Sequence, residues 1–374
     1  MRRSAAVLIL IAFAAAAMGQ TASPPAVDAK SYYLMDAASG VVLAESRATD
    51  ELDPASLTKL MTAYLAFKAL AAGEIALDDP VPVSERAWRA PGSRMFIEVG
   101  SVVAFDDLLR GLIIQSGNDA AIAIAEQLAG SEQDFVAAMN RTAAELGMTG
   151  TAWRNTSGLP ARGHVSTARD MALLARALIR DFPQYYERFS EREFTYNAIP
   201  QYNRNDLLWQ DDSVDGLKTG YTREAGYCLV SSAERDGMRL IAVIFGSTTD
   251  ATRGESSLAL LEYGFDAWET HRLYARGEAV AEARVFKGDL ETLALGPAAD
   301  VVVTVPRGSY ESLLASAALT AELVAPLAPD QVVGDLEVML GDARIASLPL
   351  VALSEVKRGG ILSRVADSVA LWFD

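Results

Sequence analysis

The residues of this chain that are best suited to chemistry are a serine and a lysine three positions apart. Ser56 and Lys59 would lie on one face of a single helical turn, because residues three apart are neighbours on a helix. A serine hydroxyl becomes an effective nucleophile when a neighbouring base takes its proton. Ser56 would also lie near the start of the helix, where the helix dipole favours developing negative charge. The pair therefore predicts an acyl-enzyme on Ser56.

The same spacing occurs a second time, at Ser354 and Lys357. This copy lies at the edge of a segment of short predicted strands, and no other candidate catalytic group accompanies it. The spacing alone is therefore a weak signal, and we interpret the second copy as coincidence. The interpretation of the first copy depends on the motifs that accompany it.

Two polar motifs accompany the first copy. Ser116 and Asn118 place a hydroxyl and an amide at a turn between two apolar helical segments. Lys218 and Thr219 add a second cation and a second hydroxyl on a predicted strand, where Gly220 allows close backbone approach. The order S-x-x-K, S-x-N and K-T-G is the motif set of penicillin-binding proteins and class A β-lactamases. Together the three motifs are a strong signal.

The sequence resembles the low-molecular-mass penicillin-binding proteins, the serine D-alanyl-D-alanine carboxypeptidase family. The resemblance covers about residues 30–356, and it is carried by residues 52–62, 114–120, 166–172, 203–205 and 214–222. It implies a β-lactamase/transpeptidase-like antiparallel sheet flanked by helices. It also implies an enzyme without cofactor or metal that removes the terminal D-alanine from peptidoglycan pentapeptides in cell wall synthesis and remodelling. The partners would be stem peptides ending in D-Ala-D-Ala, with β-lactam antibiotics as covalent inhibitors.

The base that activates Ser56 must be able to lose a proton. Burial and the positive charge of Lys218 would both lower the pKa of Lys59, which makes its neutral form accessible. The two histidines, His164 and His271, lie in no nucleophile motif. We interpret His164 as a loop residue near the rim of the site and His271 as a surface residue. Lys59 is therefore the predicted base.

The resemblance implies roles for the accompanying motifs. Ser116 would relay the proton to the leaving D-alanine, and Asn118 would hold the amide of the substrate. Lys218 and Thr219 would bind the terminal carboxylate of the substrate or orient Ser116. All of these positions carry the residue types of the family motifs.

The remaining predicted contacts lie at the end of the K-T-G strand and just beyond the last strand of the sheet. Backbone N–H groups of Ser56 and Tyr221, beside Gly220, would form the oxyanion hole. Arg253 matches the position of a family arginine near the substrate carboxylate, although an arginine here is otherwise an ordinary surface residue. The position of Tyr221, directly after K-T-G, varies among related proteins. Tyr221 therefore leaves undetermined only which side chains of the substrate are preferred.

The elements that must position these groups follow from hydrophobic periodicity. Residues 32–35 and 41–44 predict a β-hairpin, and Asp53 with Pro54 predicts the capped start of a helix that ends near Gly73. Residues 105–179 are mostly helical in pattern, residues 214–246 form an antiparallel meander, and residues 258–268 form a helix. The prediction is an α/β (α+β) catalytic domain over residues 28–273, with a sheet that has helices on its faces.

The C-terminal part has a different character. Residues 274–356 contain short strands separated by turn residues, which predicts a small all-β domain with a binding or spacing role. Residues 357–374 form an amphipathic segment behind Lys357 and Arg358, which predicts an interfacial membrane-anchoring helix. The alternative is a helix docked on the protein itself. The apolar stripe consists of Ile361, Leu362, Val365, Val369, Trp372 and Phe373.

The N-terminus has the pattern of a secretory signal peptide. Arg2 and Arg3 form a basic start, residues 5–17 are apolar, and a small-x-small cleavage site ends at Gly19. The apolar run is shorter than the roughly 20 residues of a spanning helix, although an N-terminal membrane anchor is the alternative. We predict a signal peptide over residues 1–19. The mature protein would then lie at the periplasmic face of the cytoplasmic membrane.

The composition limits partners and chemistry. A formal net charge of −16 argues against nucleic acid as a partner. Cys228 is the single cysteine, so an internal disulfide is impossible even in an oxidising compartment. Because it lies in an apolar run, we predict a buried cysteine in a strand rather than a catalytic thiol.

Two alternative functions share much of this pattern. A class A β-lactamase uses a glutamate to activate the deacylating water, but residues 146–186, where this glutamate should lie, contain no Glu. Fast hydrolysis of β-lactams is therefore not expected. A non-catalytic cell-wall binding protein is the second alternative, and the intact nucleophile and base argue against it.

Overall fold

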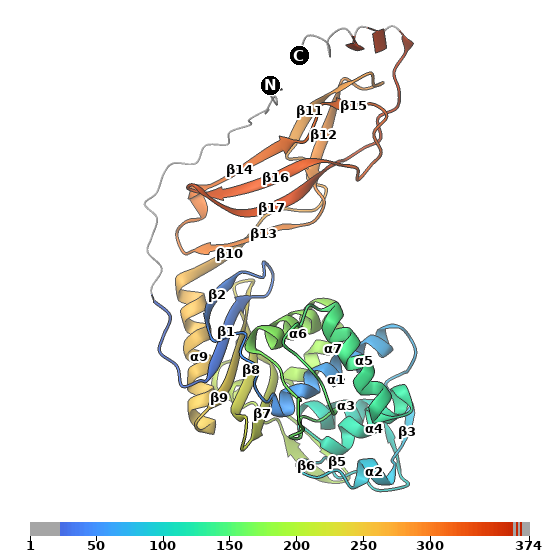
Figure 1. The fold of residues 1–374 in the computed structure, drawn as a ribbon, viewed down its shortest axis with the longest axis vertical. Coiled ribbons are helices and arrows are strands. Elements are labelled where there is room, and N and C mark those ends of the chain that lie inside the picture. Colours follow the sequence, from blue (N-terminus) through green and yellow to red (C-terminus); the bar gives the residue numbers. More distant parts are fainter. Residues whose placement is uncertain (1–22, 362–363, 366, 369–374) are drawn as a thin grey trace. The chain divides into compact units, whose positions relative to one another are not determined.

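The computed structural model describes residues 23–361, 364–365 and 367–368, which form two compact units (Figure 1). The first unit is Ser23–Asp266, and the second begins at Ala267. The boundary expected at residue 273 lies inside strand β10 (Trp268–Tyr274), because β10 pairs with β13 (Val301–Pro306) of the second unit. The predicted signal peptide and most of the predicted terminal stripe lie outside the described residues.

A five-stranded antiparallel sheet forms the centre of the first unit, in the order β2-β1-β9-β8-β7. The predicted hairpin and the predicted meander are both confirmed, and they join where β1 pairs with β9. β7 is an edge strand, so one side of its backbone is not covered by a neighbouring strand of this sheet. The strands are β1 (Ser31–Asp36), β2 (Val42–Ser46), β7 (Val214–Thr222), β8 (Gly226–Arg235) and β9 (Met238–Ser247).

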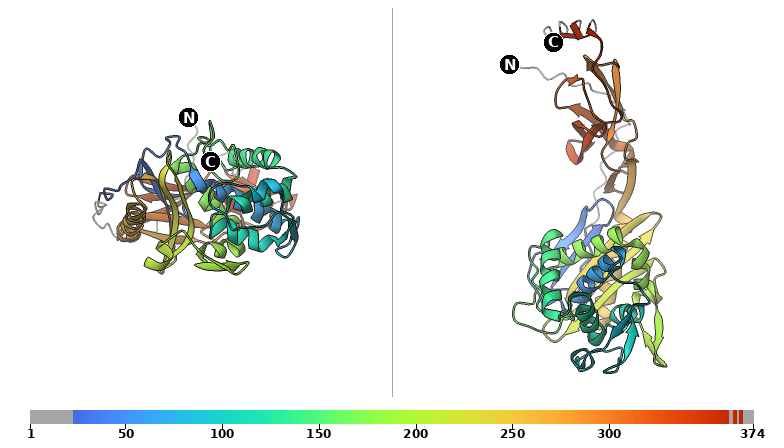
Figure 2. Two further views of the ribbon diagram at one scale, coloured as in Figure 1. Left: turned by 90° about the horizontal axis from the view of Figure 1, so that it is seen from below. Right: turned by 90° about the vertical axis from the view of Figure 1, so that its right-hand side faces the viewer.

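Helices cover both faces of this sheet, as predicted (Figures 1 and 2). Helix α9 (Asp250–Ala267) packs on one face, where Gly264 lies against Leu34 and Leu240. The other face carries the larger core, to which Met35 and Val243 contribute. Side chains along a strand alternate between faces, so β1 and β9 contribute to both layers. The helices of the second layer are α1 (Lys59–Ala71), α3 (Phe105–Ile113), α4 (Asn118–Ala129), α5 (Glu132–Glu145), α6 (Ala168–Asp181) and α7 (Pro183–Tyr186).

Several short elements connect this framework and were not predicted. They include two small strand pairs, each of which is a separate two-stranded sheet. The short elements are the 3₁₀ turns η1 (Ala55–Thr58) and η2 (Glu187–Ser190), helices α2 (Glu85–Trp88) and α8 (Leu207–Gln210), and strands β3 (Pro80–Pro82), β4 (Val102–Ala104), β5 (Glu193–Tyr196) and β6 (Ile199–Tyr202).

The second unit is built from strands around its own apolar core. Its larger sheet has the order β14-β16-β17-β12-β11-β15, and a single short 3₁₀ turn, η3 (Tyr310–Ser312), interrupts the strands of its described part. This agrees with the predicted all-β character. The strands are β11 (Ala281–Phe286), β12 (Thr292–Pro297), β14 (Leu313–Leu319), β15 (Leu323–Val324), β16 (Val332–Leu340) and β17 (Ala343–Ala352).

The described residues of the C-terminal tail make several polar contacts with the rest of the second unit. The Asp367 carboxylate accepts a hydrogen bond from the backbone N–H of Lys287 and lies 3.6 Å from Arg284. By contrast, Ile361 and Val365 are 78% and 60% exposed. The polar side of the tail thus contacts the unit, whereas these two apolar side chains face solvent. Among the described residues, no helix is long and apolar enough to cross a bilayer.

Candidate active site

Ser56 lies in a 3₁₀ turn that leads directly into α1. The predicted side-chain cap from Asp53 is wrong, because Pro54 stands at the cap position and the turn has no side-chain cap. Side chains at i and i+3 eclipse in a 3₁₀ turn, and this geometry places the Lys59 Nζ 2.9 Å from the Ser56 Oγ. The local structure therefore delivers the predicted pair by a tighter turn than an α-helix.

Lys59 contacts two further oxygen atoms. Its Nζ lies 2.7 Å from the Asn118 Oδ1 and 2.7 Å from the Ser157 carbonyl oxygen. The Pro91 carbonyl accepts a hydrogen bond from the Asn118 Nδ2 at 2.6 Å, which fixes the direction of the amide. A neutral amine has two N–H groups and one lone pair, and these two oxygens can only accept. Its lone pair is therefore left for the Ser56 hydroxyl.

The protonation of Lys59 is set by its surroundings. Its side chain is 1% exposed, and burial lowers its pKa to about 7, against the opposing charge of Asp119. The Asp119 carboxylate accepts backbone N–H bonds from Met95 and Phe96, both at 3.0 Å. It thereby ties the start of α4 to the loop that carries Pro91. Sequence reasoning missed Asp119, although it directly follows the S-x-N motif.

Lys218 is the second buried lysine of the site. It is 2% exposed, and its Nζ donates a hydrogen bond to the Thr219 carbonyl at 3.0 Å. Burial lowers the pKa of Lys218 well below its ordinary value, and the charge of Lys59 lowers it further. A Cβ on Gly220 would lie 3.1 Å from the Ser56 nitrogen. This confirms the close backbone approach expected at Gly220.

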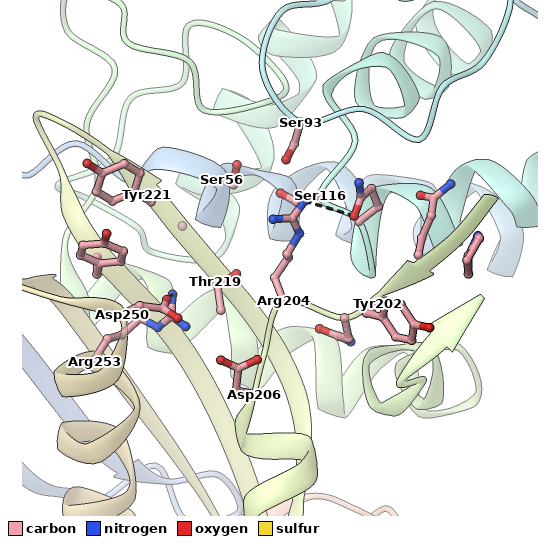
Figure 3. A pocket seen from close by; sticks show the side chains of 16 residues that line it. Ser56, Ser93, Ser116, Tyr202, Arg204, Asp206, Thr219, Tyr221, Asp250 and Arg253 are labelled. Carbon is pink, nitrogen blue, oxygen red and sulfur yellow. Dashed lines mark hydrogen bonds and ion pairs between the residues drawn. The ribbon is translucent and has the colours of Figure 1, made fainter. Parts of the chain in front are cut away.

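A cleft of about 640 Å³ opens over these groups (Figure 3). Lys59, Asn118 and Lys218 do not line the cleft but are buried beside it. The predicted site residues that line it are Ser56, Ser116, Thr219, Gly220, Tyr221 and Arg253. The structure thus brings all of the predicted site residues together around one opening, in two groups that differ in their access to a ligand.

Two of the lining residues have unusual surroundings. Ser116 connects α3 to α4 with a φ of 64°, and its side chain is almost fully buried. Arg253 is only 5% exposed, which contradicts the interpretation as an ordinary surface residue. It lies in the first turn of α9, because this helix begins at Asp250 rather than near residue 258. Its guanidinium pairs with Asp250 at 2.7 Å.

His164 is not at the rim of the site, contrary to the sequence interpretation. It is 1% exposed, and its Nδ1 accepts the backbone N–H of Arg154 at 2.9 Å. The Thr58 hydroxyl donates to the Ala55 carbonyl, so the His164 Nε2 donates to Thr58 at 2.8 Å. Burial lowers the pKa of His164 to about 4. The neutral ring therefore supports the 3₁₀ turn η1 through its hydrogen bond to Thr58.

One wall of the cleft was missed by sequence reasoning. From the end of β6 onward, the exposed residues Tyr202, Arg204 and Asp206 line the cleft, and they alternate with buried residues. One of the buried residues, Asn205, donates to the Gly216 carbonyl at 3.0 Å and so fixes this segment beside β7. Arg204 reaches across to the Gln115 side chain at 3.2 Å. The buried positions of this segment are Gln201, Asn203 and Asn205, which are all polar, so no apolar alternation in the sequence marks this wall.

The family of this chain follows from comparison with known sequences. The family model of the S11 peptidases, described as D-alanyl-D-alanine carboxypeptidase, matches residues 18–249. The chain belongs to this family. A second model, described as the C-terminal domain of penicillin-binding protein 5, matches residues 268–358.

Individual members of the family are similar over nearly the whole chain. D-alanyl-D-alanine carboxypeptidase DacC of Escherichia coli is 46% identical over 98% of this chain and 94% of its own length. Penicillin-binding protein 5 from Haemophilus influenzae has a similar structure, with a TM-score of 0.87 and 39% identity over 90% of this chain and 100% of that one. The ampicillin-bound penicillin-binding protein D2 from Listeria monocytogenes has a TM-score of 0.59 and 33% identity over 64% of this chain and 98% of that one.

Proposed function

We propose that this protein is a serine-type D-Ala-D-Ala carboxypeptidase that acts through an acyl-enzyme on Ser56. Ser56 attacks the carbonyl of the penultimate D-alanine, the terminal D-alanine leaves, and water then releases the shortened peptide. The observation that carries this proposal is the contact of the Lys59 Nζ with the Ser56 Oγ, together with a Lys59 pKa of about 7. A base with a pKa near the working pH is both available in its neutral form and strong enough to take the proton.

The backbone around Ser56 supports stabilisation of the oxyanion. The N–H of Ser56 and the N–H of Tyr221 are the proposed donors, and preorganised donors of this kind stabilise charge that develops in the transition state. Gly220 supports this arrangement, because its lack of a side chain lets β7 approach the Ser56 nitrogen. The uncovered edge of β7 can also pair with an extended peptide.

The groups on the other side of Ser56 suit the leaving residue. Ser116 lines the cleft and is assigned the transfer of the proton to the leaving amine. Thr219 and Arg253 line the same cleft, and we assign them the terminal carboxylate. Lys218, buried beside Thr219, adds positive potential when it is protonated. Asn118 has both amide atoms engaged, so we assign it the orientation of Lys59 in place of the predicted contact with the substrate.

Penicillins would acylate the same serine. This proposal is supported by the ampicillin-bound form of the similar Listeria protein. Efficient hydrolysis of the adduct needs a carboxylate that activates water, and residues 146–186 contain no Glu. Asp170, an acid in that segment, already accepts the N–H of Gly150 and the hydroxyl of Thr151. We therefore assign a carboxypeptidase rather than a β-lactamase.

Two assays on the full chain test the proposal. The protein should release free D-alanine from a peptide that ends in D-Ala-D-Ala. It should also form a long-lived covalent adduct with a labelled penicillin. Rapid turnover of the penicillin would favour the β-lactamase alternative. A folded protein that forms no adduct and releases no D-alanine would favour a non-catalytic cell-wall binding protein.

We further propose that the protein is exported and acts on peptidoglycan at the periplasmic face of the membrane. The basic and apolar pattern of residues 1–19 supports export. Exposed Ile361 and Val365 support an interfacial role of the tail, since Asp367 directs the polar side of the tail toward the second unit. An interfacial helix binds through buried apolar area and through basic residues near anionic lipid. The net charge of −16 argues against nucleic acid as a partner.

A further inference from the structure

The part of the cleft around Arg253 contains two carboxylates that binding of a terminal carboxylate by Arg253 does not require. Arg253 is almost fully buried, and no atom among the described residues accepts a hydrogen bond from its Nε. Burial lowers the pKa of Arg253, and the charges of Asp250 and Asp206 oppose this shift. Both acids line the cleft together with Arg253. A carboxylate ligand at Arg253 would therefore meet two negative charges beside it.

Asp206 is the more available of these two acids. It directly precedes α8, but its side chain makes no capping hydrogen bond there. Over the described part of the chain, no hydrogen bond or salt bridge engages its carboxylate, which is exposed. In Figure 3, this carboxylate points toward Thr219, from the same side of the cleft as Arg253. It is thus a free anionic group beside the expected position of the leaving residue.

Two further features beside Arg253 suit a positive charge. The Asp250 carboxylate is paired with Arg253, yet its side chain is still 56% exposed. Tyr227 lines the cleft and stacks on Tyr221, with ring centroids 4.4 Å apart. The face of an aromatic ring attracts cations. The competing cation in this cleft, Arg204, is directed to Gln115 on another wall.

We propose that Asp206, Asp250 and Tyr227 form a subsite for a cationic side chain on the leaving residue. This inference rests on the proposed function, since it takes Arg253 as the group that binds the terminal carboxylate. The enzyme then accepts a C-terminal D-residue that carries an amine, such as D-lysine, in addition to D-alanine. The methyl group of D-alanine makes no use of these charges. A cleft of about 640 Å³ has room for a longer side chain.

The chemistry of the step is unchanged by the larger leaving residue. The Ser56 oxygen forms a bond to the carbonyl carbon of the penultimate D-alanine, and the bond from this carbon to the leaving nitrogen breaks. The leaving amine takes up the proton that the serine lost. Water then cleaves the ester and restores Ser56. The side-chain ammonium contributes only to binding and orientation.

The test compares two peptides that differ only in the last residue, one ending in D-Ala-D-Ala and one in D-Ala-D-Lys. For Asp206→Asn, kcat/KM for the D-Lys peptide should fall about fivefold, the scale of one partly exposed ion pair. For the D-Ala peptide it should rise about twofold, because a negative charge near its carboxylate is removed. Asp206→Glu should restore the preference. Added salt should reduce the D-Lys to D-Ala ratio in the unmodified enzyme more than in Asp206→Asn.

Asp212→Asn is the matched control. Asp212 is fully exposed, pairs with Arg192 at 3.2 Å and does not line the cleft. It should leave the ratio of the two kcat/KM values unchanged. The inference is overturned if D-alanine is released but the ratio is the same in Asp206→Asn, Asp212→Asn and the unmodified enzyme. Failure of the folded unmodified enzyme to release D-alanine would instead overturn the proposed function itself.

Discussion

Glu132, at the start of α5, accepts two hydrogen bonds from Thr156, one from its N–H at 3.1 Å and one from its hydroxyl at 2.9 Å. The other carboxylate oxygen of Glu132 binds the Arg86 guanidinium. The residue after Thr156 is Ser157, whose carbonyl contacts Lys59. The buried carboxylate therefore holds the backbone of this turn where the base needs an acceptor.

Replacing Glu132 by Gln should slow acylation by a labelled penicillin about tenfold, since small displacements of a catalytic group have effects of this order. The midpoint of the pH–rate profile should move to lower pH, because the Lys59 ammonium loses part of its stabilisation by an acceptor. Glu145→Gln is the control, since Glu145 ends the same helix in an exposed pair with Lys68. Equal acylation rates and equal midpoints in the two variants would contradict the proposed role of Glu132.

Ser56→Ala should abolish acylation by penicillin and leave the fold intact, because the change removes only the nucleophile. Ser354→Ala should acylate at the rate of the unmodified protein, since Ser354 is exposed in the second unit. Gel fluorescence of a labelled penicillin measures the acylation of both variants, and circular dichroism checks that each is folded. A labelled Ser56→Ala protein would rule out Ser56 as the nucleophile.

The acylation rate should rise with pH through about 7 and then level off. Lys59 takes the serine proton only when neutral, and its pKa of about 7 places that change near neutral pH. Lys59→Arg should lower the rate at every pH, because arginine does not lose its proton in this range. The measurement is the acylation rate by stopped flow, from about pH 5 to about pH 9, a range that brackets the pKa of Lys59. A flat profile in the unmodified protein would contradict lysine as the base.

The stability of the first unit should fall between pH 6.5 and about 4, partly because of His164. Its folded-state pKa of about 4 is below the ordinary value of 6.5. The unfolded chain therefore binds a proton in this window while the folded chain does not, so stability is fully present above pH 6.5 and is lost as the pH falls. The loss reaches about 3 kcal/mol. In urea denaturation, His164→Gln should be less stable at neutral pH but should show a weaker pH dependence; an unchanged dependence would refute this.

Deleting residues 359–374 should release the protein from membranes and should preserve release of D-alanine from a small soluble peptide. Affinity for the membrane would come from the apolar side of the tail, on which Ile361 and Val365 are exposed. Replacing both Trp372 and Phe373 by Asp should have the same effect as the deletion. Fractionation of the mature truncated protein is the measurement. If it still sediments with membranes, the tail is not the anchor.

Local patterns were sufficient to predict the framework of the first unit. The hairpin, the helical middle section and the meander have clear periodicities. The S-x-N and K-T-G motifs fall on their predicted turn and strand, whereas Ser56 lies in a 3₁₀ turn that precedes α1. The buried position of Cys228 in β8 is also confirmed. Burial raises the pKa of this thiol to about 12, which suits a structural rather than a reactive cysteine.

The supporting contacts of the site could not be predicted in the same way. Glu132 and Thr156, or His164 and Thr58, are joined only by the folded chain, and neither side of such a pair has a periodic signature. The prediction that His164 lies at the rim is wrong, because the folded chain buries the ring and engages both of its nitrogens, with Arg154 and with Thr58. Arg253 lines the cleft, but the early start of α9 that buries it was not apparent from the sequence.

The close approach of Gly220 to Ser56 has a consequence for the mechanics of the molecule. Ser56 belongs to the helical layer and Gly220 to the edge of the sheet, so the nucleophile stands at the seam between two parts of the unit. An acyl group would be covalently attached on one side of this seam and hydrogen-bonded to β7 on the other. The acyl group would then link the helical layer to the edge of the sheet and oppose local separation of the two. A bound antibiotic would in this way slow unfolding and proteolysis of the very protein that it disables.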